Sequence, residues 1–332
     1  MNRHVHLLTM MSKSDFVEKK IVIVNSLKSE KLSFSNDNIL VKDEDEVTLH
    51  QSSCHNLLAV YVIGNFTITS ILIDKAKKYG FSFFVLSPNL RTKCSILNGL
   101  DGNTLLHRKQ YGYAGSEIGQ RIILNKVQNQ KNLLKKERQK DELLNLTISN
   151  LDKCIDALSC SELDRPKIMA VEGFAAKQFF ACYYQKLDWD GRRPRAKNDP
   201  INTSLDIGYS MLFNYVDAIM KMYDFDSYVG VLHTEFYKRK SLVCDMMEPF
   251  RCMIDEATRK SFNYKTFSSD DFEVINNRYN LRHVADSKYQ RMYLSTLVEH
   301  KTDFFEYIQS YYRWFMKGKD LKEFPVFIYD DH

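Results

Sequence analysis

Short apolar runs separated by turn residues occupy the first hundred positions of the chain. A β-branched run covers 21–24, apolar residues flank the turn-forming residues 35–38, and a continuous apolar run covers 57–63 before Gly64-Asn65. Runs of this length, bounded by turn residues, are typical of β-strands. The pattern therefore predicts a β-rich N-terminal domain, with a further short strand at 47–49.

The spacing changes to that of a helix between residues 68 and 78. Ile68, Leu72 and Ala76 are four residues apart, which places them on one helix face. Gly80 is a suitable helix end, and the apolar run 81–86 that follows predicts a buried strand. We expect one helix inserted into the β domain.

Helical spacing dominates the rest of the chain, from Ser116 to about Phe315. A chain of 332 residues exceeds the usual size of one domain, so we expect two. The predicted fold class is α+β. The expected divisions are a β-rich assembly domain at 1–105, a basic connector at 106–115 and an α-helical domain at 116–332.

Composition is that of an ordinary folded protein, with 44% hydrophobic and 27% charged residues. The seven cysteines form no CxxC pair, so a zinc ribbon or disulfide framework is not indicated. No secretory signal is evident, and the longest apolar run, 57–63, is far shorter than the ~20 residues that cross a bilayer. We expect a cytoplasmic protein with no membrane segment.

A net charge of +5 permits an anionic partner without requiring one, so the position of the basic residues matters more than their total. The basic residues between 121 and 140 most simply form a solvated helix face. The loop at 191–197 differs, because its Gly and Pro oppose a helix and its guanidinium groups suit phosphates. It makes these residues candidate DNA contacts: Arg192, Arg193, Arg195 and Lys197.

Glu172 is the first candidate for chemistry. It lies on a predicted helix that begins near Pro166, and no cation stands three or four residues away on either side. A carboxylate against an apolar face must be neutral, paired from another element or bound to a metal. The segment leaves pairing with a distant Lys or Arg and metal binding equally open.

His233 and the segment 245–248 supply the other candidates. His233 follows an apolar run, where a histidine usually only satisfies a hydrogen bond. Asp245 and Glu248 have the spacing of a helix N-cap and its third residue, so a capping box explains them equally well. A histidine with two or three carboxylates is also a donor set for Mg²⁺ or Mn²⁺.

Four segments, in this order, resemble the CRISPR-associated spacer integrase family, the universal adaptation nucleases of CRISPR systems. They are Ala170-Val-Glu-Gly-Phe-Ala-Ala-Lys177, Asn198-Asp-Pro-Ile-Asn-Thr-Ser-Leu-Asp-Ile-Gly-Tyr209, Gly230-Val-Leu-His-Thr234 and Leu242-Val-Cys-Asp-Met-Met-Glu-Pro-Phe-Arg251. N-terminal segments at 64–69, 83–88 and 108–111 are also similar to the family. The resemblance covers nearly the whole chain and depends on the order of the motifs.

The resemblance implies a small β-sandwich-like N-terminal domain followed by a larger all-α catalytic domain. It implies Mg²⁺ or Mn²⁺ held by Glu172, His233 and Glu248, with Asp245 as an accessory catalytic acid. Arg251 is either a DNA contact or a structural partner for an acid. The implied partners are double-stranded DNA (prespacer and CRISPR repeat) and the small companion adaptation protein, with a homodimer inside a larger complex.

Three functions remain open on this reading. The first is an integrase that joins 3′-hydroxyl ends of short DNA to the boundary of a CRISPR repeat by transesterification. The second is a structure-specific endonuclease, in which water replaces the hydroxyl at the same site. The third is a non-catalytic DNA-binding scaffold in which Glu172 and Glu248 are ion-paired structural acids.

Overall fold

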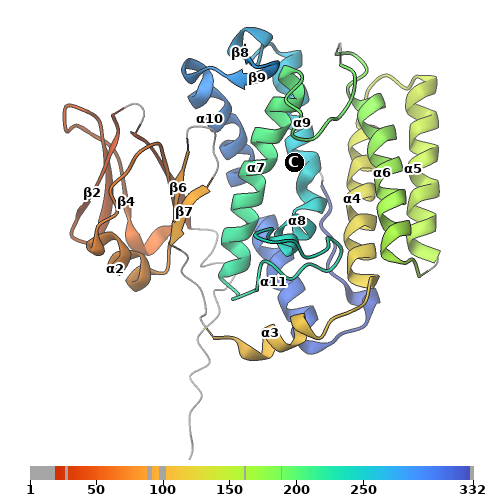
Figure 1. The fold of residues 1–332 in the computed structure, drawn as a ribbon, viewed down its shortest axis with the longest axis horizontal. Helices are drawn as coiled ribbons and strands as arrows, with labels where there is room; N and C mark the ends of the chain where they lie inside the picture. Colours follow the sequence, from red (N-terminus) through yellow and green to blue (C-terminus); the bar gives the residue numbers. More distant parts are fainter. Residues whose placement is uncertain are drawn as a thin grey trace, which may run out of the picture. The chain divides into compact units, whose positions relative to one another are not determined.

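The computed structural model describes residues 19–26, 29–87, 92–96, 102–160, 162–187 and 189–329. The chain forms two compact units, which are described separately below (Figure 1). Unit 1 comprises residues 1–87, 92–98 and 299–306, and unit 2 comprises 88–91, 99–298 and 307–332. In the part of the chain so described, no helix has the length and apolar character needed to cross a membrane.

Unit 1 contains two sheets. The four-stranded sheet has the order β1-β5-β6-β7, in which β1 and β6 run parallel to the central strand β5 and β7 runs antiparallel to β6. The three-stranded sheet is an antiparallel meander, β2-β3-β4. The strands are β1 (Lys20–Asn25), β2 (Lys31–Ser35), β3 (Asn38–Lys42), β4 (Thr48–Ser53), β5 (Leu57–Ile63), β6 (Ser82–Leu86) and β7 (Thr92–Ile96).

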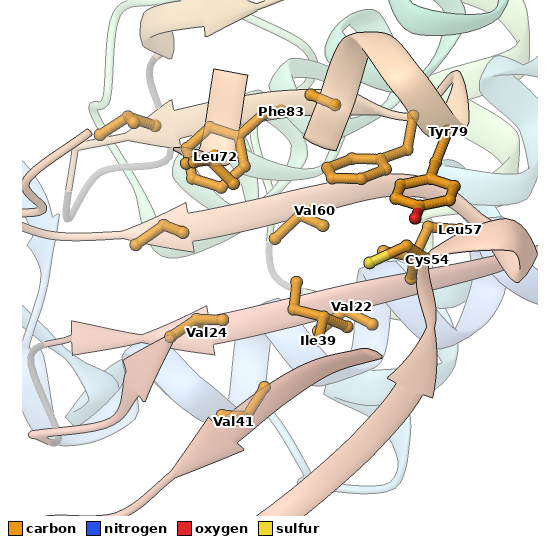
Figure 2. Packing of buried hydrophobic residues seen from close by; sticks show 14 residues of the cluster. Val22, Val24, Ile39, Val41, Cys54, Leu57, Val60, Leu72, Tyr79 and Phe83 are labelled. Atoms are coloured by element: carbon orange, nitrogen blue, oxygen red, sulfur yellow. The ribbon is translucent and has the colours of Figure 1, made fainter. Parts of the chain in front are cut away.

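One apolar core joins the two sheets to helix α2 (Ser70–Tyr79) (Figure 2). Val22 and Val60 from the first sheet, Ile39 from the second and Leu72 from α2 are all buried in it. Gly80 ends α2 in the left-handed conformation, with φ of 72°, which suits glycine. The predicted β domain with one inserted helix is therefore confirmed.

Unit 2 is mainly helical. Three long helices, α4, α5 and α6, lie side by side, and α7 packs against α9 (Figure 1). The helices are α3 (Thr104–Tyr111), α4 (Glu117–Lys135), α5 (Glu142–Cys160), α6 (Arg165–Tyr183), α7 (Pro200–Lys221), α8 (Ser241–Met246), α9 (Arg251–Asn263), α10 (His283–Glu299) and α11 (Lys301–Lys317). The last residue of α10 and the first six residues of α11 are counted in unit 1. Short 3₁₀ segments include η2 (Cys54–Asn56) in unit 1 and η3 (Glu248–Phe250), η4 (Ser269–Asp271) and η5 (Leu321–Glu323) in unit 2.

The α+β class is confirmed, but the helical unit also carries a hairpin that the sequence interpretation missed. Strands β8 (Phe272–Ile275) and β9 (Arg278–Leu281) pair antiparallel. Asn276 and Asn277 connect them with φ of 51° and 58°. Two successive left-handed residues are the signature of a tight hairpin turn, and Asn tolerates this conformation better than most residues.

The segment expected to be a basic connector is also different, because residues 104–111 form helix α3. Gln110 exchanges two hydrogen bonds with the backbone of Asp226, at 3.0 and 3.1 Å. Lys109 donates to the carbonyl oxygen of Met316 at 2.6 Å. Gln110 and Lys109 therefore fix α3 within unit 2.

The segment from Phe324 to Tyr329, called the C-terminal strap below, lies in extended form against α4. Asn125 binds both the backbone N–H and the carbonyl oxygen of Phe327, at 2.9 and 2.7 Å. Asn129 accepts from the backbone N–H of Tyr329 at 3.0 Å. Because the two asparagines are one helical turn apart, they hold the strap along the helix as a neighbouring strand would.

Candidate active site

Lys126 is the centre of the candidate site. Its side chain, from the middle of α4, is only 7% exposed. The ammonium group forms ion pairs with the carboxylates of Glu172, from α6, and Glu248, from η3. The distance from Lys126 Nζ to Glu248 Oε2 is 2.7 Å. Two of the three predicted metal ligands therefore converge on one point, which carries a positive charge.

This arrangement corrects one expectation and shows a partner for Glu172. Lys126 belongs to the basic run predicted to face solvent, but it is buried. Glu172, for which pairing from another element was left open, is paired with this lysine. Ile122 and Ile123 precede Lys126 by four and three residues, so helical spacing places the lysine on the apolar face of α4. That spacing was the signal that could have identified it.

Glu248 is ionised although it is buried. Burial alone would raise the pKa of its carboxyl, but Arg251 and Lys126 outweigh burial and lower the pKa to about 2. Arg251 Nη2 lies 2.9 Å from Glu248 Oε1. Of the two roles considered for Arg251, the structure shows the ion pair with an acid.

His233 is held by Asp245. The imidazole Nδ1 lies 2.6 Å from Asp245 Oδ1, and the backbone N–H of His233 donates to the same oxygen at 3.0 Å. The other oxygen, Oδ2, accepts from the backbone N–H groups of Val231 and Leu232 at 2.7 and 3.0 Å. A carboxylate acceptor at Nδ1 favours the tautomer that leaves Nε2 with a free lone pair.

Local geometry explains how Asp245 reaches this backbone. The residue lies inside α8 and is fully buried, and Glu248 begins η3 without a side-chain cap, so the capping-box interpretation is wrong. Gly230 completes the fit, because a Cβ there would lie 2.6 Å from the carbonyl oxygen of His233 and 3.0 Å from Asp245 Oδ2. The Gly-Val-Leu-His turn thus wraps closely around one carboxylate.

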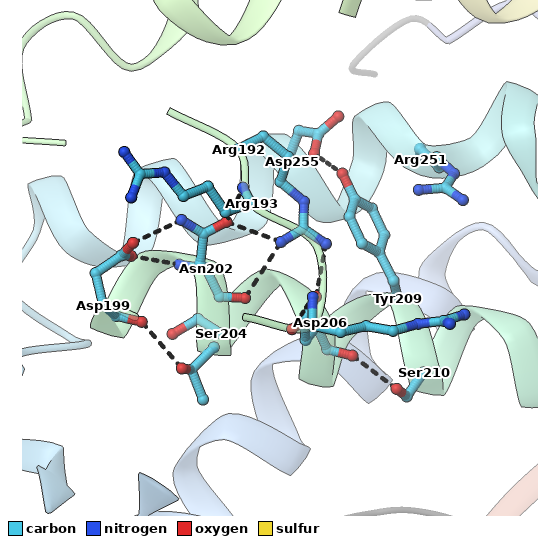
Figure 3. Close-up of polar contacts among 12 residues, drawn as sticks. Arg192, Arg193, Asp199, Asn202, Ser204, Asp206, Tyr209, Ser210, Arg251 and Asp255 are labelled. Carbon is cyan, nitrogen blue, oxygen red and sulfur yellow. Dashed lines mark hydrogen bonds and ion pairs between the residues drawn. The ribbon is translucent and has the colours of Figure 1, made fainter. Parts of the chain in front are cut away.

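The predicted DNA-binding loop contains residues of two kinds (Figure 3). Arg192 ion-pairs with Asp206 at 2.6 Å and donates to the side chain of Asn202 at 2.9 Å, so its guanidinium is already engaged. Arg193 and Arg195 are exposed. Lys197 is half-buried and donates to the side chain of Asn280 at 3.3 Å. The backbone N–H groups of Arg193 and Arg195 bind Asn202 and Asp206, which fixes the loop on α7.

A buried tyrosine connects this loop with the site. The ring of Tyr209, on α7, lies between the guanidinium groups of Arg192 and Arg251, whose central carbons are 5.3 and 4.7 Å from its centroid. Its hydroxyl donates to the carboxylate of Asp255 (Figure 3). Burial raises the pKa of Asp255 to about 7, even though the hydrogen bond from Tyr209 opposes the rise.

Carboxylates and an imidazole are donor types that bind a divalent cation, and in this structure the ammonium group of Lys126 supplies the positive charge beside the two carboxylates. Two carboxylates from different elements already point at one cation, and Glu248 Oε2 is buried without a hydrogen bond of good geometry. A protonated His233 would lower the pKa of Glu248 further. Within the described ranges, no group of three or more His, Cys, Asp or Glu side chains is placed to hold an ion.

Comparison with known proteins agrees with this fold. The family model of the CRISPR associated protein Cas1 matches residues 23–294. A protein named CRISPR-associated endonuclease Cas1 1 from Thermodesulfovibrio yellowstonii is 26% identical over 281 residues, which is 80% of this chain and 88% of that relative.

Two solved structures have the same fold. One, described as a Cas6-RT-Cas1–Cas2 complex, has a TM-score of 0.74 at 20% identity over 93% of this chain and 36% of its own. The other, a casposase bound to integration product, has a TM-score of 0.70 at 18% identity over 91% of this chain and 92% of its own.

The α+β fold and the family-model match place the chain in the class of CRISPR-associated proteins. The family model covers most of the residues in the chain. The chain belongs to the Cas1 family.

Proposed function

We propose that this chain is a metal-dependent DNA integrase of CRISPR adaptation, which joins 3′-hydroxyl ends of short DNA to the boundary of a CRISPR repeat. The observation that carries the proposal is the convergence of Glu172 and Glu248 on one buried cation position. Family membership and the casposase likeness, whose description names an integration product, support the reaction class.

In this proposal Glu172, Glu248 and His233 hold Mg²⁺ or Mn²⁺, with imidazole favouring Mn²⁺. The bound ion would polarise phosphoryl oxygens and lower the pKa of the attacking 3′-hydroxyl. Asp245 orients His233 and is itself saturated by three backbone N–H groups, so it is a positioning residue. Arg251 keeps Glu248 ionised and aimed at the cation.

The exposed guanidinium groups of Arg193 and Arg195 are the proposed phosphate contacts of the 191–197 loop, with Lys197 beside them. Arg192 supports the loop through Asp206. Removal of one exposed arginine should weaken DNA binding and reduce its dependence on salt, because fewer counterions are released. The proposed assembly is a homodimer with the small companion adaptation protein on double-stranded DNA, in line with the described Cas1–Cas2 complex.

Strand joining tests the proposal directly. The chain, the companion protein, a short duplex with free 3′-hydroxyls and a repeat-bearing plasmid are incubated with Mn²⁺ or Mg²⁺. We expect joined strands, a loss of at least about 100-fold with Glu172→Gln, as for removal of a group that stabilises the transition state, and little change with the exposed control Glu142→Gln. No joining with either ion, or full joining by Glu172→Gln, would contradict it.

The endonuclease alternative has a specific basis, because the curated relative is named an endonuclease. The same incubation with branched DNA distinguishes it, since cleavage without joining would show that water is the nucleophile. The scaffold alternative also has a basis, because it predicted ion-paired acids and Lys126 pairs with both. A true ion site stabilises the fold by mass action, so the scaffold predicts no Mn²⁺-dependent rise in melting temperature.

A further inference from the structure

The cluster of ion pairs at the candidate site contains as many positive charges as negative ones. Lys126 pairs with Glu172 and Glu248, and Arg251 pairs with Glu248 at 2.9 Å. Two carboxylates therefore face two cations, and the four charges sum to zero. An arriving divalent ion is attracted by the carboxylates and repelled by the cations at similar range. Taken together, these four side chains offer it little net attraction.

Two other buried acids of the helical unit do little to restore a negative charge. Both oxygens of Asp245 accept backbone N–H groups, and one of them also contacts the His233 ring. The dipoles of these N–H groups offset the charge of the carboxylate. Asp255 accepts from Tyr209, and burial raises the pKa of Asp255 to about 7, so it is only partly ionised at neutral pH.

The ammonium group of Lys126 is held between the two acids. Its side chain is 7% exposed, and a buried charge that loses its partners is strongly destabilised. Asn129, one turn further along α4, donates to the carbonyl oxygen of Pro249 at 3.0 Å, which fixes the start of η3 beside the helix that carries the lysine. An ion at this site must therefore share Glu172 and Glu248 with Lys126.

The DNA substrate can supply the negative charge that the cluster lacks. Each phosphodiester carries one negative charge, and Mg²⁺ is commonly held by one or two carboxylates together with substrate phosphates. With a phosphate present the sum of charges becomes negative, which favours the ion. Coupling between two ligands is reciprocal, so a bound ion must raise the affinity for DNA by the same factor.

We propose that Lys126 is a built-in counter-cation that makes binding of the divalent ion depend on bound DNA. In the free chain the ammonium group holds Glu172 and Glu248 together and lowers their affinity for the ion. When DNA is bound, its phosphate compensates the lysine charge. The inference rests on the proposed function, because it describes how the same site is loaded. Lys126 acts through the two carboxylates, so it is a positioning residue.

The test measures Mn²⁺ binding to the full chain by electron paramagnetic resonance of the unbound ion. Titrations are run without DNA and with a duplex that lacks 3′-hydroxyls and so cannot be joined, and the ions bound by the duplex alone are subtracted. We expect DNA to raise the Mn²⁺ affinity of the wild type by about 5- to 150-fold, the usual range of coupling between two sites. Without DNA, Lys126→Gln should bind Mn²⁺ at least about 10-fold more tightly than the wild type, and its gain from DNA should be smaller.

Two control variants separate the position of the charge from its presence. Lys131→Gln removes one positive charge from the same helix, at the partly exposed pair with Asp152, and should leave the Mn²⁺ affinity unchanged. Lys126→Arg keeps the charge and should keep the weak binding of the free chain. If Lys126→Gln does not fold, the wild type still decides, because DNA must raise its Mn²⁺ affinity and Mn²⁺ must raise its DNA affinity by the same factor.

Equal Mn²⁺ affinity of the wild type with and without DNA would overturn the inference, and so would equal affinity of wild type and Lys126→Gln in the free chain. Failure of the proposed function looks different, because the effect of Lys126 on Mn²⁺ binding would persist while no strand joining occurs. If joining proceeds but Lys126→Gln binds Mn²⁺ as the wild type does, the integrase proposal stands and the counter-cation inference fails.

Discussion

The two units differ in what they bury. In unit 1, the buried polar side chains among the described residues are uncharged: Asn25, Ser52 and Ser82. The described part of unit 2 buries seven ionisable residues, which are Lys126, Asp217, Asp245, Glu248, Asp255, Glu256 and Asp286. Burying a charge costs several kcal/mol of desolvation free energy unless the charge is paired. The interior of unit 2 therefore depends on ion pairs and hydrogen bonds that unit 1 does not need.

This difference in buried residues determines how each unit responds to substitution. An apolar core depends on volume and tolerates small changes in a graded way. A buried ionic network depends on each partner, because loss of one leaves another charge unpaired. We therefore expect changes in unit 2 to be abrupt and coupled, and changes in unit 1 to be gradual.

The largest expected effect comes from Lys126→Met, which leaves Glu172 and Glu248 facing each other. The free energy of unfolding without divalent ions should fall by about 3–5 kcal/mol, as for other broken buried ion pairs. Urea denaturation measures it. The control Lys131→Met removes a partly exposed pair with Asp152 and should cost at most about 1 kcal/mol. Equal losses for the two variants would contradict the comparison.

The next effect concerns pH. The pKa of Asp255 is raised from 3.8 to about 7, so the folded chain holds a proton that the unfolded chain has released. Stability from this group is therefore complete below pH 4 and is lost as pH rises toward 7, by about 1.4 kcal/mol per pKa unit. Relative to wild type, Asp255→Asn should gain stability steadily across this range in urea titrations. A constant difference between the two proteins would count against it.

Asp245→Asn should have a somewhat smaller effect on stability, about 2–3 kcal/mol. The amide nitrogen cannot accept from the backbone N–H groups of residues 231–233, so at least one of them loses its partner. Thermal unfolding measures the loss, and Asp156→Asn on the exposed face of α5 is the control. Strand joining should fall with it, because His233 loses its orientation. Unchanged stability would show that these amides do not need the carboxylate.

The smallest effect is expected in unit 1. Ile39→Val removes one methylene from the core between the sheets and should cost about 1 kcal/mol. Strand joining should be unchanged within error, because the substitution leaves every residue of unit 2 intact. A clear loss of joining at unchanged stability would show that the apolar unit also shapes the chemistry.

The fold could be read from the sequence more completely than the site. The continuous apolar run at 57–63, the four-residue spacing from Ile68 to Ala76 and the stop at Gly80 predicted β5 and α2, because those signals act between near neighbours. The β8–β9 hairpin was missed even though Asn276-Asn277 is a turn signal, because helical spacing surrounds it. The α+β fold class therefore followed from the spacing of hydrophobic residues alone.

The candidate site depends on contacts across long stretches of sequence. Glu172 and its partner Lys126 are 46 residues apart, and no local rule pairs them. His233 and Asp245 were selected from motif order. The hydrogen bonds from three backbone N–H groups to the Asp245 carboxylate were not predictable, because they require the chain at 230–233 to turn around that side chain. The roles in metal binding and DNA contact remain predictions.

The C-terminal strap has a consequence for the order of events during synthesis. Asn129 also donates to the carbonyl oxygen of Pro249, at 3.0 Å, so this one amide fastens both the strap and the residue after Glu248. Its partners in the strap are translated about 200 residues later. A growing chain that already contains Glu172, His233 and Glu248 therefore still lacks the strap residues that bind Asn125 and Asn129. The strap can therefore close along α4 only after synthesis has passed Tyr329, well after the residues of the candidate site have been made.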